Sequence, residues 1–459
     1  MDFQEIQALI EKQKSFFATG KTKKLEFRIK QLQKLKHLIA NNWEEIVDCI
    51  KKDIGRNEIE GYVFDILPVL KECDLFIKNL KKWAKPQKVQ SALGTSSYIF
   101  SEPYGSVLIL SPWNYPFFLA LLPAVGAIAA GNTVILKPSE LSPHTSSYIK
   151  EMIVNNFPQE EFAIVEGDAD SAKYLTAQKF DYIFFTGSPK IGKVVYETAA
   201  RNLIPVTLEL GGKSPCIVDE NSDFEKAVKR IVWGKTINGG QTCIAPDYLL
   251  INEKVKTKFV EKFNYYVKEF FGENPKESKF YTRIANKKSF DRLVSLMQQG
   301  DIIAGGTTDE NDLYIAPTLI DNIDCSDEIM QEEIFGPVLP VLTYTEIQEA
   351  IDFINLHPKP LALYIFSNDK KFVNKILKST SSGGVCINDT ILHASSKNMP
   401  FGGVGNSGIG AYIGEYSFKT FSHQKSVLKN SSIIDRDFLY PPYKIFSFKM
   451  LRYIVNKML

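Results

Sequence analysis

The sequence predicts an α/β protein built on parallel β-sheets, and three observations support this prediction. Short β-branched runs alternate with helical stretches in the first half of the chain, similar runs follow in the second half, and one helical stretch is apolar nearly all round. Such alternation is typical of right-handed βαβ crossovers, which cover a parallel sheet on both faces. Because 459 residues are too many for one hydrophobic core, we expect two or three domains.

The first predicted element is an amphipathic helix from about Lys21 to Asn42. Lysine and arginine fill one side of it, and apolar residues recur at helical spacing on the other, namely Leu25, Ile29, Leu32, Leu35 and Ile39. A basic face of this kind is more often a solvated helix surface than a partner-binding one. We therefore interpret it as solvent-exposed.

The first alternating region runs from about Ser106 to Leu208. Its expected strands are Val107 to Leu110, Val134 to Leu136, Ala163 to Val165, Tyr182 to Phe185 and Val206 to Leu208. The apolar stretch from Phe117 to Ala130 is typical of a buried helix, and Pro116 suits its first turn. Since Pro123 interrupts it, the stretch falls short of the ~20 apolar residues that span a membrane.

A second α/β region begins near Glu209 and carries Cys243. Helices are expected from Phe224 to Ile237 and from Val255 to Phe271, and strands at Pro337 to Leu342, Ala362 to Phe366 and Gly384 to Asn388. Two further intervals look strand-like and lie outside both α/β regions, Lys81 to Glu102 and Tyr416 to Leu428.

Composition excludes several classes of protein. A chain that is 44% apolar and 24% charged is ordinary for a globular protein, and a net charge of +2 gives no case for nucleic-acid binding. The six cysteines include no Cys-x-x-Cys pair and the five histidines are scattered, so we expect free thiols, a reducing cytoplasm and no metal site. The first residues are charged and helical-looking, which disfavours secretion.

The most informative residues are Cys243, in the run Gly239-Gly240-Gln241-Thr242-Cys243, and Glu209, before Gly211-Gly212. A lone cysteine with small neighbours is more often an inert buried thiol than a nucleophile. A carboxylate at the exit of a buried strand into a Gly-Gly turn, however, points into a cleft. A thiol and a carboxylate that converge there predict covalent catalysis with a general base.

Two other segments suit chemistry at the same cleft. The strand that ends at Phe185 leads into a turn where Ser188 can cap the next helix with Pro189 at its first position, leaving backbone N–H groups for a phosphate. Asn114 offers two uncharged donors, as an oxyanion hole requires. Outside a motif, Asn114 would more often be a turn residue before Pro116.

These motifs together resemble the NAD(P)-dependent aldehyde dehydrogenases, and within them the class 3 branch of fatty- and aromatic-aldehyde dehydrogenases. The resemblance runs from about residue 5 to about residue 430 and includes these further motifs: Trp113-Asn114-Tyr115-Pro116, Lys137-Pro138-Ser139-Glu140, Thr186 to Gly192, Glu332-Glu333-Ile334-Phe335-Gly336-Pro337 and Pro400-Phe401-Gly402-Gly403.

The resemblance implies a domain organisation. A Rossmann-like dinucleotide-binding domain would comprise residues 1–80 and 104–208, and a catalytic domain residues 209–410. Residues 81–103 and 411–430 would form a two-part β-strand oligomerisation arm, so that the protein would be a homodimer. Residues 431–459 remain as a basic amphipathic tail.

The resemblance also implies roles for individual residues. Cys243, Glu209, Asn114 and Glu333 would be catalytic, with either carboxylate as the base that activates water. The cofactor residues would be Trp113, Lys137, Glu140, Gly187, Ser188, Ile191, Gly192 and Phe335. A carboxylate at Glu140 would accept the 2′-hydroxyl of NAD and repel a 2′-phosphate, so NAD is the expected cofactor and NADP the alternative.

Aromatic residues would line the substrate tunnel, namely Tyr115, Trp233 and Phe401, although each taken singly is more often a core residue. Phe401 opens a glycine-dense loop that we expect to lack regular structure. Because these residues include no cation, apolar medium- or long-chain aliphatic or aromatic aldehydes are favoured as substrates. The Cys243 thiolate would form a thiohemiacetal and then a thioester, which water hydrolyses to a carboxylic acid.

Two other functions would fit parts of this pattern. A cysteine-dependent hydrolase shares the thiol and the base, but it normally pairs its cysteine with a histidine, and no histidine lies near a motif. A non-catalytic binding protein on the same fold would typically have lost Cys243 or Glu209.

The tail contains basic residues and no acidic one from Lys444 to Leu459. In a helix, Lys449, Arg452 and Asn456 would share a narrow polar face opposite a broad apolar one. About 15 residues are too few to span a bilayer. We therefore expect an interfacial helix that rests on anionic lipid or gates the tunnel, or else packing of the apolar face on a dimer partner.

Overall fold

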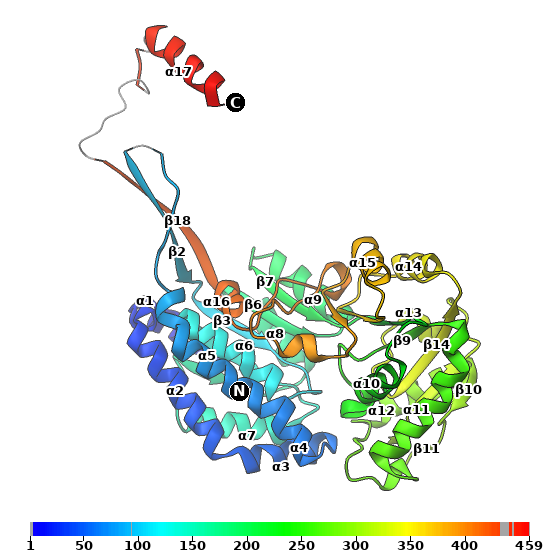
Figure 1. Ribbon diagram of the computed structural model, residues 1–459. Coiled ribbons are helices and arrows are strands. Elements are labelled where there is room, and N and C mark those ends of the chain that lie inside the picture. The colour runs from blue at the N-terminus through cyan, green and yellow to red at the C-terminus, as the bar shows by residue number, and fades with distance from the viewer. Residues whose placement is uncertain (1–2, 93, 432–439, 443–444, 459) are drawn as a thin grey trace.

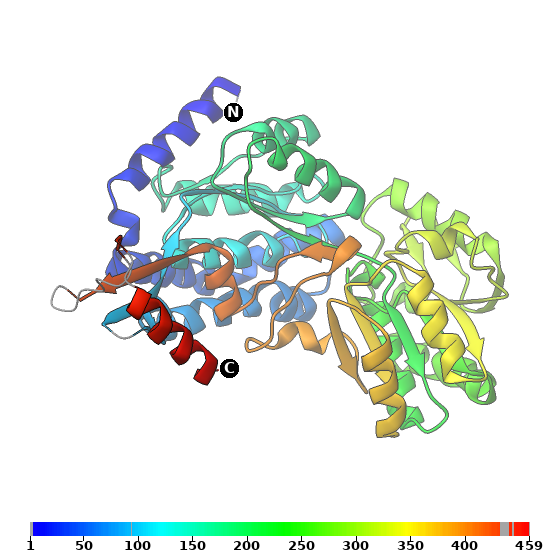
Figure 2. The ribbon, with the colours of Figure 1, turned by 90° about the horizontal axis from the view of Figure 1, so that it is seen from above.

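The computed structural model describes residues 3–92, 94–431, 440–442 and 445–458. Two α/β lobes lie side by side, and a β-arm projects from the lobe that holds the N-terminal half of the chain (Figures 1 and 2). The predicted fold class, parallel sheets covered by helices, is confirmed. The domain limits given above stay a prediction.

The sheet of the first lobe has six strands in the order β17-β7-β6-β3-β4-β5. Its strands are β3 (Ser106–Leu110), β4 (Thr133–Lys137), β5 (Phe162–Ile164), β6 (Tyr182–Gly187), β7 (Val206–Leu210) and β17 (Gly408–Ile409). All pairs are parallel except β17 with β7. Glu209, expected just after a strand, lies inside β7, opposite Thr186 of β6 and Gly408 of β17.

Helices cover both faces of this sheet. They are α1 (Phe3–Ala18), α2 (Leu25–Asn41), α3 (Trp43–Ile54), α4 (Glu58–Glu60), α5 (Leu67–Trp83), α6 (Phe118–Ala130), α7 (Pro143–Val154), α8 (Ala169–Ala177) and α9 (Pro189–Ala200), with the 3₁₀ turn η1 (Lys21–Lys23) and the π-helix η2 (Gly61–Ile66). As predicted, α6 is buried along almost its whole length. The expected apolar stripe of α2 packs in the core through Leu32, Leu35 and Ile39.

The sheet of the second lobe has seven strands in the order β10-β13-β14-β9-β8-β15-β16. They are β8 (Pro215–Val218), β9 (Tyr248–Asn252), β10 (Asp301–Ala304), β13 (Thr318–Asp321), β14 (Val338–Tyr344), β15 (Ala362–Phe366) and β16 (Gly384–Ile387), and β11 (Thr308–Asp309) pairs with β12 (Tyr314–Ile315) beside it. The sequence predicted three of these strands, β14, β15 and β16, and missed β8, β9, β10, β13 and the β11–β12 pair.

The helices of this lobe are α10 (Phe224–Thr236), α11 (Lys256–Phe271), α12 (Lys287–Leu296), α13 (Glu328–Gln331), α14 (Ile347–Leu356) and α15 (Lys370–Ser379). Short 3₁₀ turns join them, η3 (Ile237–Gly240), η4 (Glu253–Val255), η5 (Pro275–Glu277), η6 (Met297–Gln299) and η7 (Leu392–Ser395). The glycine-dense loop after Phe401 is not irregular throughout, since it contains η8 (Gly405–Ser407) and β17.

The arm consists of β1 (Gln87–Val89), β2 (Thr95–Pro103) and β18 (Ser422–Asn430), and β18 pairs with β2 along its whole length. Both intervals predicted to be strand-like begin with helical residues. Lys81 belongs to α5, and Tyr416 belongs to α16 (Glu415–Thr420). These helical ends form because their apolar side chains reach the core, where Trp83 of α5 contacts Phe418 of α16.

The tail forms the predicted helix, α17 (Ile445–Met458), beyond the arm (Figure 1). Apolar side chains of α17 face solvent, among them Phe448, Tyr453 and Val455. Of the tail, residues 432–439, 443, 444 and 459 lie outside the described residues. Within the described part of the chain, no helix combines the length and apolar character that crossing a membrane requires.

Candidate active site

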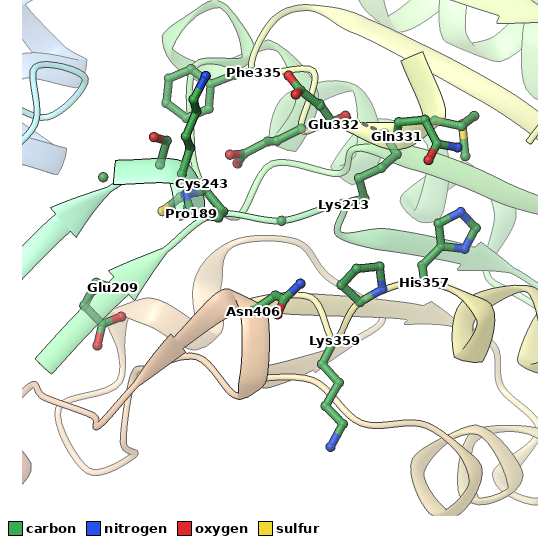
Figure 3. Close-up of a pocket in the computed structure, with 18 of the residues that line it drawn as sticks. Pro189, Glu209, Lys213, Cys243, Gln331, Glu332, Phe335, His357, Lys359 and Asn406 are labelled. Carbon is green, nitrogen blue, oxygen red and sulfur yellow. Dashed lines mark hydrogen bonds between the residues drawn. The ribbon is translucent and has the colours of Figure 1, made fainter. Parts of the chain in front are cut away.

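A cavity of about 770 Å³ receives residues from both lobes (Figure 3). Among the predicted site residues, those that line it are Trp113, Asn114, Gly187, Ser188, Glu209, Cys243, Glu333 and Phe335. In the close-up, Glu209 and Cys243 lie toward one side of the cavity and His357 toward the other. The fold thus brings the thiol and both carboxylates, distant in sequence, to one space.

Cys243 stands on a tight loop after α10. Asn238, Gly239 and Gly240 all adopt positive φ, at 53°, 60° and 74°. A side chain at position 240 would place its Cβ 2.3 Å from the carbonyl oxygen of Gly336, so only glycine fits there. The loop leaves Cys243 half-buried at the cavity wall.

The electrostatic surroundings of Cys243 disfavour its thiolate form. Burial raises the pKa of Cys243, and the nearby charges of Glu333 and Glu209 raise it further. A thiol in this environment reacts as a thiolate only when a neighbouring base accepts its proton.

The two carboxylates are themselves desolvated. Glu209 is 3% exposed, and neither of its oxygens has a hydrogen-bond partner among the described residues, so burial raises its pKa well above the ordinary value. Burial, followed by the charge of Asp247, raises the pKa of Glu333 to about 8, although the Gly212 N–H and two lysines oppose the shift. Both carboxylates are therefore stronger bases than an exposed glutamate.

The segment that carries Glu333 is held from several sides. Arg292 donates hydrogen bonds to the carbonyl oxygens of Glu333 and Ile334, and the Ile334 N–H donates to Asp247 at 2.9 Å. Lys213 forms an ion pair with Asp247 and donates to the carbonyl oxygen of Glu332 at 3.1 Å. These contacts fix the segment along the cavity.

Asn114 follows β3 and is 3% exposed. Its side-chain Nδ2 donates to the carbonyl oxygen of Gln241 at 3.0 Å, which ties it to the loop of Cys243. The neighbouring Trp113 ring packs edge to face on Phe335, with ring centroids 5.7 Å apart. This pair gives the cavity an aromatic wall.

The start of α9 opens on the same cavity through Gly187 and Ser188. As predicted, Ser188 is the N-cap, and its hydroxyl accepts a hydrogen bond from the Ile191 N–H at 3.4 Å. The backbone N–H groups and positive dipole end of this helix suit an anionic group. Lys190 and Lys213, which also line the cavity, add positive charge.

Several predicted site residues do not line this cavity. Among the cofactor residues, Lys137 is buried on β4 and paired with Glu140 at 2.7 Å, Ile191 is exposed, and Gly192 packs against Leu210. The remaining ones were expected in the tunnel. Tyr115 is buried with its hydroxyl 2.7 Å from that of Thr242, Trp233 packs on Phe64, and Phe401 packs on Tyr412. The rings of these three residues therefore pack against other side chains of the protein instead of lining the cavity.

Sequence reasoning missed a group of buried polar residues behind the cavity. Arg56, Asp65, Asn238 and Gln241 are each at most 1% exposed and are hydrogen-bonded to one another or to Asn114. Lys235 is also buried, its Nζ has no hydrogen-bond partner among the described residues, and burial lowers its pKa to about 8. Asp65 and Lys235 stand in stretches that are otherwise apolar, which was the signal available in the sequence, whereas Arg56 stands among polar residues.

A parallel α/β fold that gathers a thiol, two desolvated carboxylates and a helix N-terminus around one deep cavity defines a cofactor-dependent enzyme. The family model described as the aldehyde dehydrogenase family matches residues 1–427, and the chain belongs to this family.

Individual relatives agree. The chain is 46% identical over 436 residues to the 4,4'-diaponeurosporen-aldehyde dehydrogenase of Staphylococcus aureus, which covers 94% of this chain and 95% of that protein. It is 45% identical over 442 residues to the dimeric NADP-preferring aldehyde dehydrogenase of Rattus norvegicus, and the match covers 95% of this chain and 98% of the rat protein. A solved structure described as the substrate bound state of Staphylococcus aureus AldH matches with a TM-score of 0.96 and 45% identity, covering 98% and 99%.

The predicted family and activity are therefore confirmed. The chain is an aldehyde dehydrogenase of the class 3 type, an enzyme that oxidises aldehydes to carboxylic acids with NAD(P). The hydrolase and the non-catalytic binding protein are not favoured.

Proposed function

We propose that the chain oxidises apolar aldehydes, aliphatic of medium or long chain or aromatic, through a covalent intermediate on Cys243. The observation that carries this proposal is the common cavity of Cys243, Asn114, Glu209 and Glu333. In it, a thiol of raised pKa faces carboxylates whose own pKa values are raised, so that a proton can pass between them.

The residues around the cavity fit a dinucleotide. The N-terminus of α9, at Gly187 and Ser188, would hold the pyrophosphate, and Glu333 with Phe335 would hold the nicotinamide ribose. Lys137 and Glu140 would bind the adenosine ribose from beside the cavity. NAD is the proposed preference because Glu140 would meet a 2′-phosphate with a negative charge.

In the proposed reaction, a carboxylate accepts the proton of Cys243, and the thiolate attacks the carbonyl carbon of the aldehyde. The side-chain amide of Asn114 and the Cys243 N–H stabilise the oxyanion that forms. NAD(P), when bound, supplies the acceptor for the hydride that leaves this carbon. Glu209 or Glu333 then activates water, which hydrolyses the thioester on Cys243 and releases the carboxylic acid.

The preference for apolar aldehydes is supported by the walls near Cys243. Trp113, Phe335 and Leu119 line the cavity, and Phe401 packs against the same apolar cluster as Cys243. Burial of an aliphatic chain or an aromatic ring against such residues is favourable, whereas a carboxylate at the far end of the aldehyde would lose its hydration there.

The proposal is tested by the rate of reduced nicotinamide formation from a panel of aldehydes with NAD and with NADP. We expect kcat/KM to rise with chain length and to be higher for benzaldehyde than for aldehydes that also carry a carboxylate. Equal rates for succinic semialdehyde and a six-carbon aliphatic aldehyde would contradict the substrate class.

We further propose a cytoplasmic homodimer that assembles through the arm. Because β18 is an edge strand, its free backbone groups can pair with a second chain. The exposed apolar residues of α17 and its basic residues suit a peripheral contact with anionic membranes. A monomeric mass by light scattering at micromolar concentration, with full activity, would contradict the dimer.

A further inference from the structure

We propose that Arg56 is a positioning residue that aims the Asn114 side chain at the oxyanion, an inference that rests on the proposed function of Asn114. Arg56 lies 58 residues before Asn114, in the short connection between α3 and α4. No motif identified in the sequence includes it.

The guanidinium of Arg56 has partners in three directions. One terminal nitrogen forms an ion pair with Asp65, the other donates to the backbone carbonyl oxygen of Asn114, and Nε donates to Oδ1 of Asn238 at 3.1 Å. Its Cζ lies over the Tyr115 ring, 4.2 Å from the ring centre. With 1% of its surface exposed, Arg56 makes these contacts away from bulk water.

Asn238 connects Arg56 to the loop that carries Cys243 through hydrogen bonds of its side chain. Since its Oδ1 accepts from Arg56, its Nδ2 faces the other way and donates to the carbonyl oxygens of Asn114 and Gln241, both at 3.0 Å. The carbonyl oxygen of Gln241 also accepts the hydrogen bond from Nδ2 of Asn114. Arg56 and Asn238 thereby fix the backbone of Asn114 and the acceptor of its side chain together.

An amide nitrogen carries two hydrogens, and in Asn114 one of them is used by Gln241. That bond restrains rotation of the amide about its Cβ–Cγ bond and thereby the direction of its second N–H. Asn114 lines the cavity beside Cys243, so this hydrogen is available to an oxyanion there. Preorganised donors of this kind stabilise charge without reorganisation during the reaction.

Asp65 anchors the other side of Arg56. It lies in the π-helix η2, and its Oδ1 accepts hydrogen bonds from the Phe117 and Phe118 N–H groups, both at 3.1 Å. These residues begin α6, three and four positions after Asn114. Single-turn π-helices inside α-helical segments are frequent at functional sites. The ion pair therefore ties the segment after Asn114 to the same guanidinium.

The test is Arg56→Lys in the full-length enzyme. An ammonium can keep the charge pair with Asp65, but it lacks the planar fork that reaches Asn238 and Asn114 at once. We expect kcat to fall about 10- to 100-fold with KM changed by less than about threefold, because the oxyanion donor is misdirected rather than removed, and removal costs about 10²–10³.

A double-mutant cycle separates positioning from mere stability. In an Asn114→Ala background, Arg56→Lys is expected to cost no further activity, since the group through which it acts is gone. Alkylation of Cys243 by iodoacetamide creates no oxyanion and is expected to keep its rate. Full additivity of the two losses, or a parallel loss in alkylation, would overturn the proposal.

A matched control is Arg28→Lys, which alters a buried arginine of the same lobe that donates to the carbonyl oxygens of Thr22, Lys23 and Ala129. It should change the unfolding midpoint without changing kcat. If Arg56→Lys does not fold, Asn238→Gly carries the same test, because glycine tolerates φ of 53° at that position. Unchanged activity of Asn114→Ala would instead refute the proposed role of Asn114.

Discussion

Replacement of Glu209 by glutamine tests which carboxylate activates the deacylating water. The change keeps the shape of the side chain and removes its ability to accept a proton. Because the carboxylate of Glu209 has no hydrogen-bond partner among the described residues, the substitution removes no hydrogen bond from the site. Loss of activity in a folded Glu209→Gln protein would therefore reflect chemistry.

The expected magnitude follows from the step affected. A positioned general base contributes about 10²–10⁴-fold, so steady-state turnover should fall by that factor. Attack by Cys243 and hydride transfer precede the attack of water. A first burst of reduced nicotinamide, one per active site, should therefore survive.

Burial raises the pKa of both Glu209 and Glu333, so the pH dependence of turnover in the two glutamine variants distinguishes them. A carboxylate acts as a base only when ionised, so deacylation should accelerate as pH rises through its pKa. With a pKa of about 8, Glu333 is about one-tenth ionised at pH 7 and nine-tenths at pH 9. If Glu333 is the base, turnover should rise by about that ratio and level off, and Glu333→Gln should abolish the rise.

The assay is stopped-flow fluorescence of reduced nicotinamide from pH 6.5 to 9.5 for the parent and both glutamine variants, with circular dichroism as a control for folding. We expect Glu209→Gln to show a burst followed by slow turnover. Unchanged turnover in Glu209→Gln, together with a crippled Glu333→Gln, would show that Glu209 is not the base.

Three further outcomes are expected. Cys243→Ser should lose more than nine-tenths of dehydrogenase activity while dinucleotide binding stays measurable by fluorescence titration, because a hydroxyl supplies no nucleophile at neutral pH. If the variant keeps more than about a tenth of the activity, Cys243 is not the nucleophile. Burial raises the pKa of Glu72 to about 7, so its contribution to stability is present below about pH 4.5 and is lost as pH rises through 7. Since glutamine can still accept from Gly414 and Ser417, Glu72→Gln should be more stable than the parent by about 1–3 kcal/mol in urea at pH 8 and equal to it at pH 4.5, and a difference that does not grow with pH would contradict this. A truncation after Asp437 should bind anionic liposomes less and lose preference for long aldehydes, whereas no change in either would exclude the membrane and gating roles of the tail.

Local sequence patterns were sufficient for much of the fold. The apolar stretch of α6, the strands from β3 to β7 and the cap at Ser188 each depend on residues a few positions apart, so their periodicity and turn chemistry are readable in order. The motifs around Cys243 and Glu209 also occur in the family's order, and they predicted the activity.

Other features depend on contacts between distant segments. Trp83 and Phe418 lie in helices because their side chains contact each other at the core. The side chains of Tyr115, Trp233 and Phe401 pack on neighbouring residues and do not line the cavity. No residue close to them in the sequence specifies those partners. For this reason the sequence predicted strands where α5 and α16 end and begin, and it did not predict that Tyr115, Trp233 and Phe401 lie outside the cavity that Cys243 lines.

The electrostatics of the site has the same origin. The pKa shifts of Glu209 and Glu333 come from burial, and burial is the sum of every segment that packs around a carboxylate. Likewise, Arg56 reaches Asn114 and Asn238 across 58 and 182 residues of chain. Residue types and their spacing therefore specified the helices, the strands and the kind of reaction. Long-range packing brought the site residues together and excluded water from them, and in this way it set the pKa of the two glutamates and the orientation of the Asn114 amide.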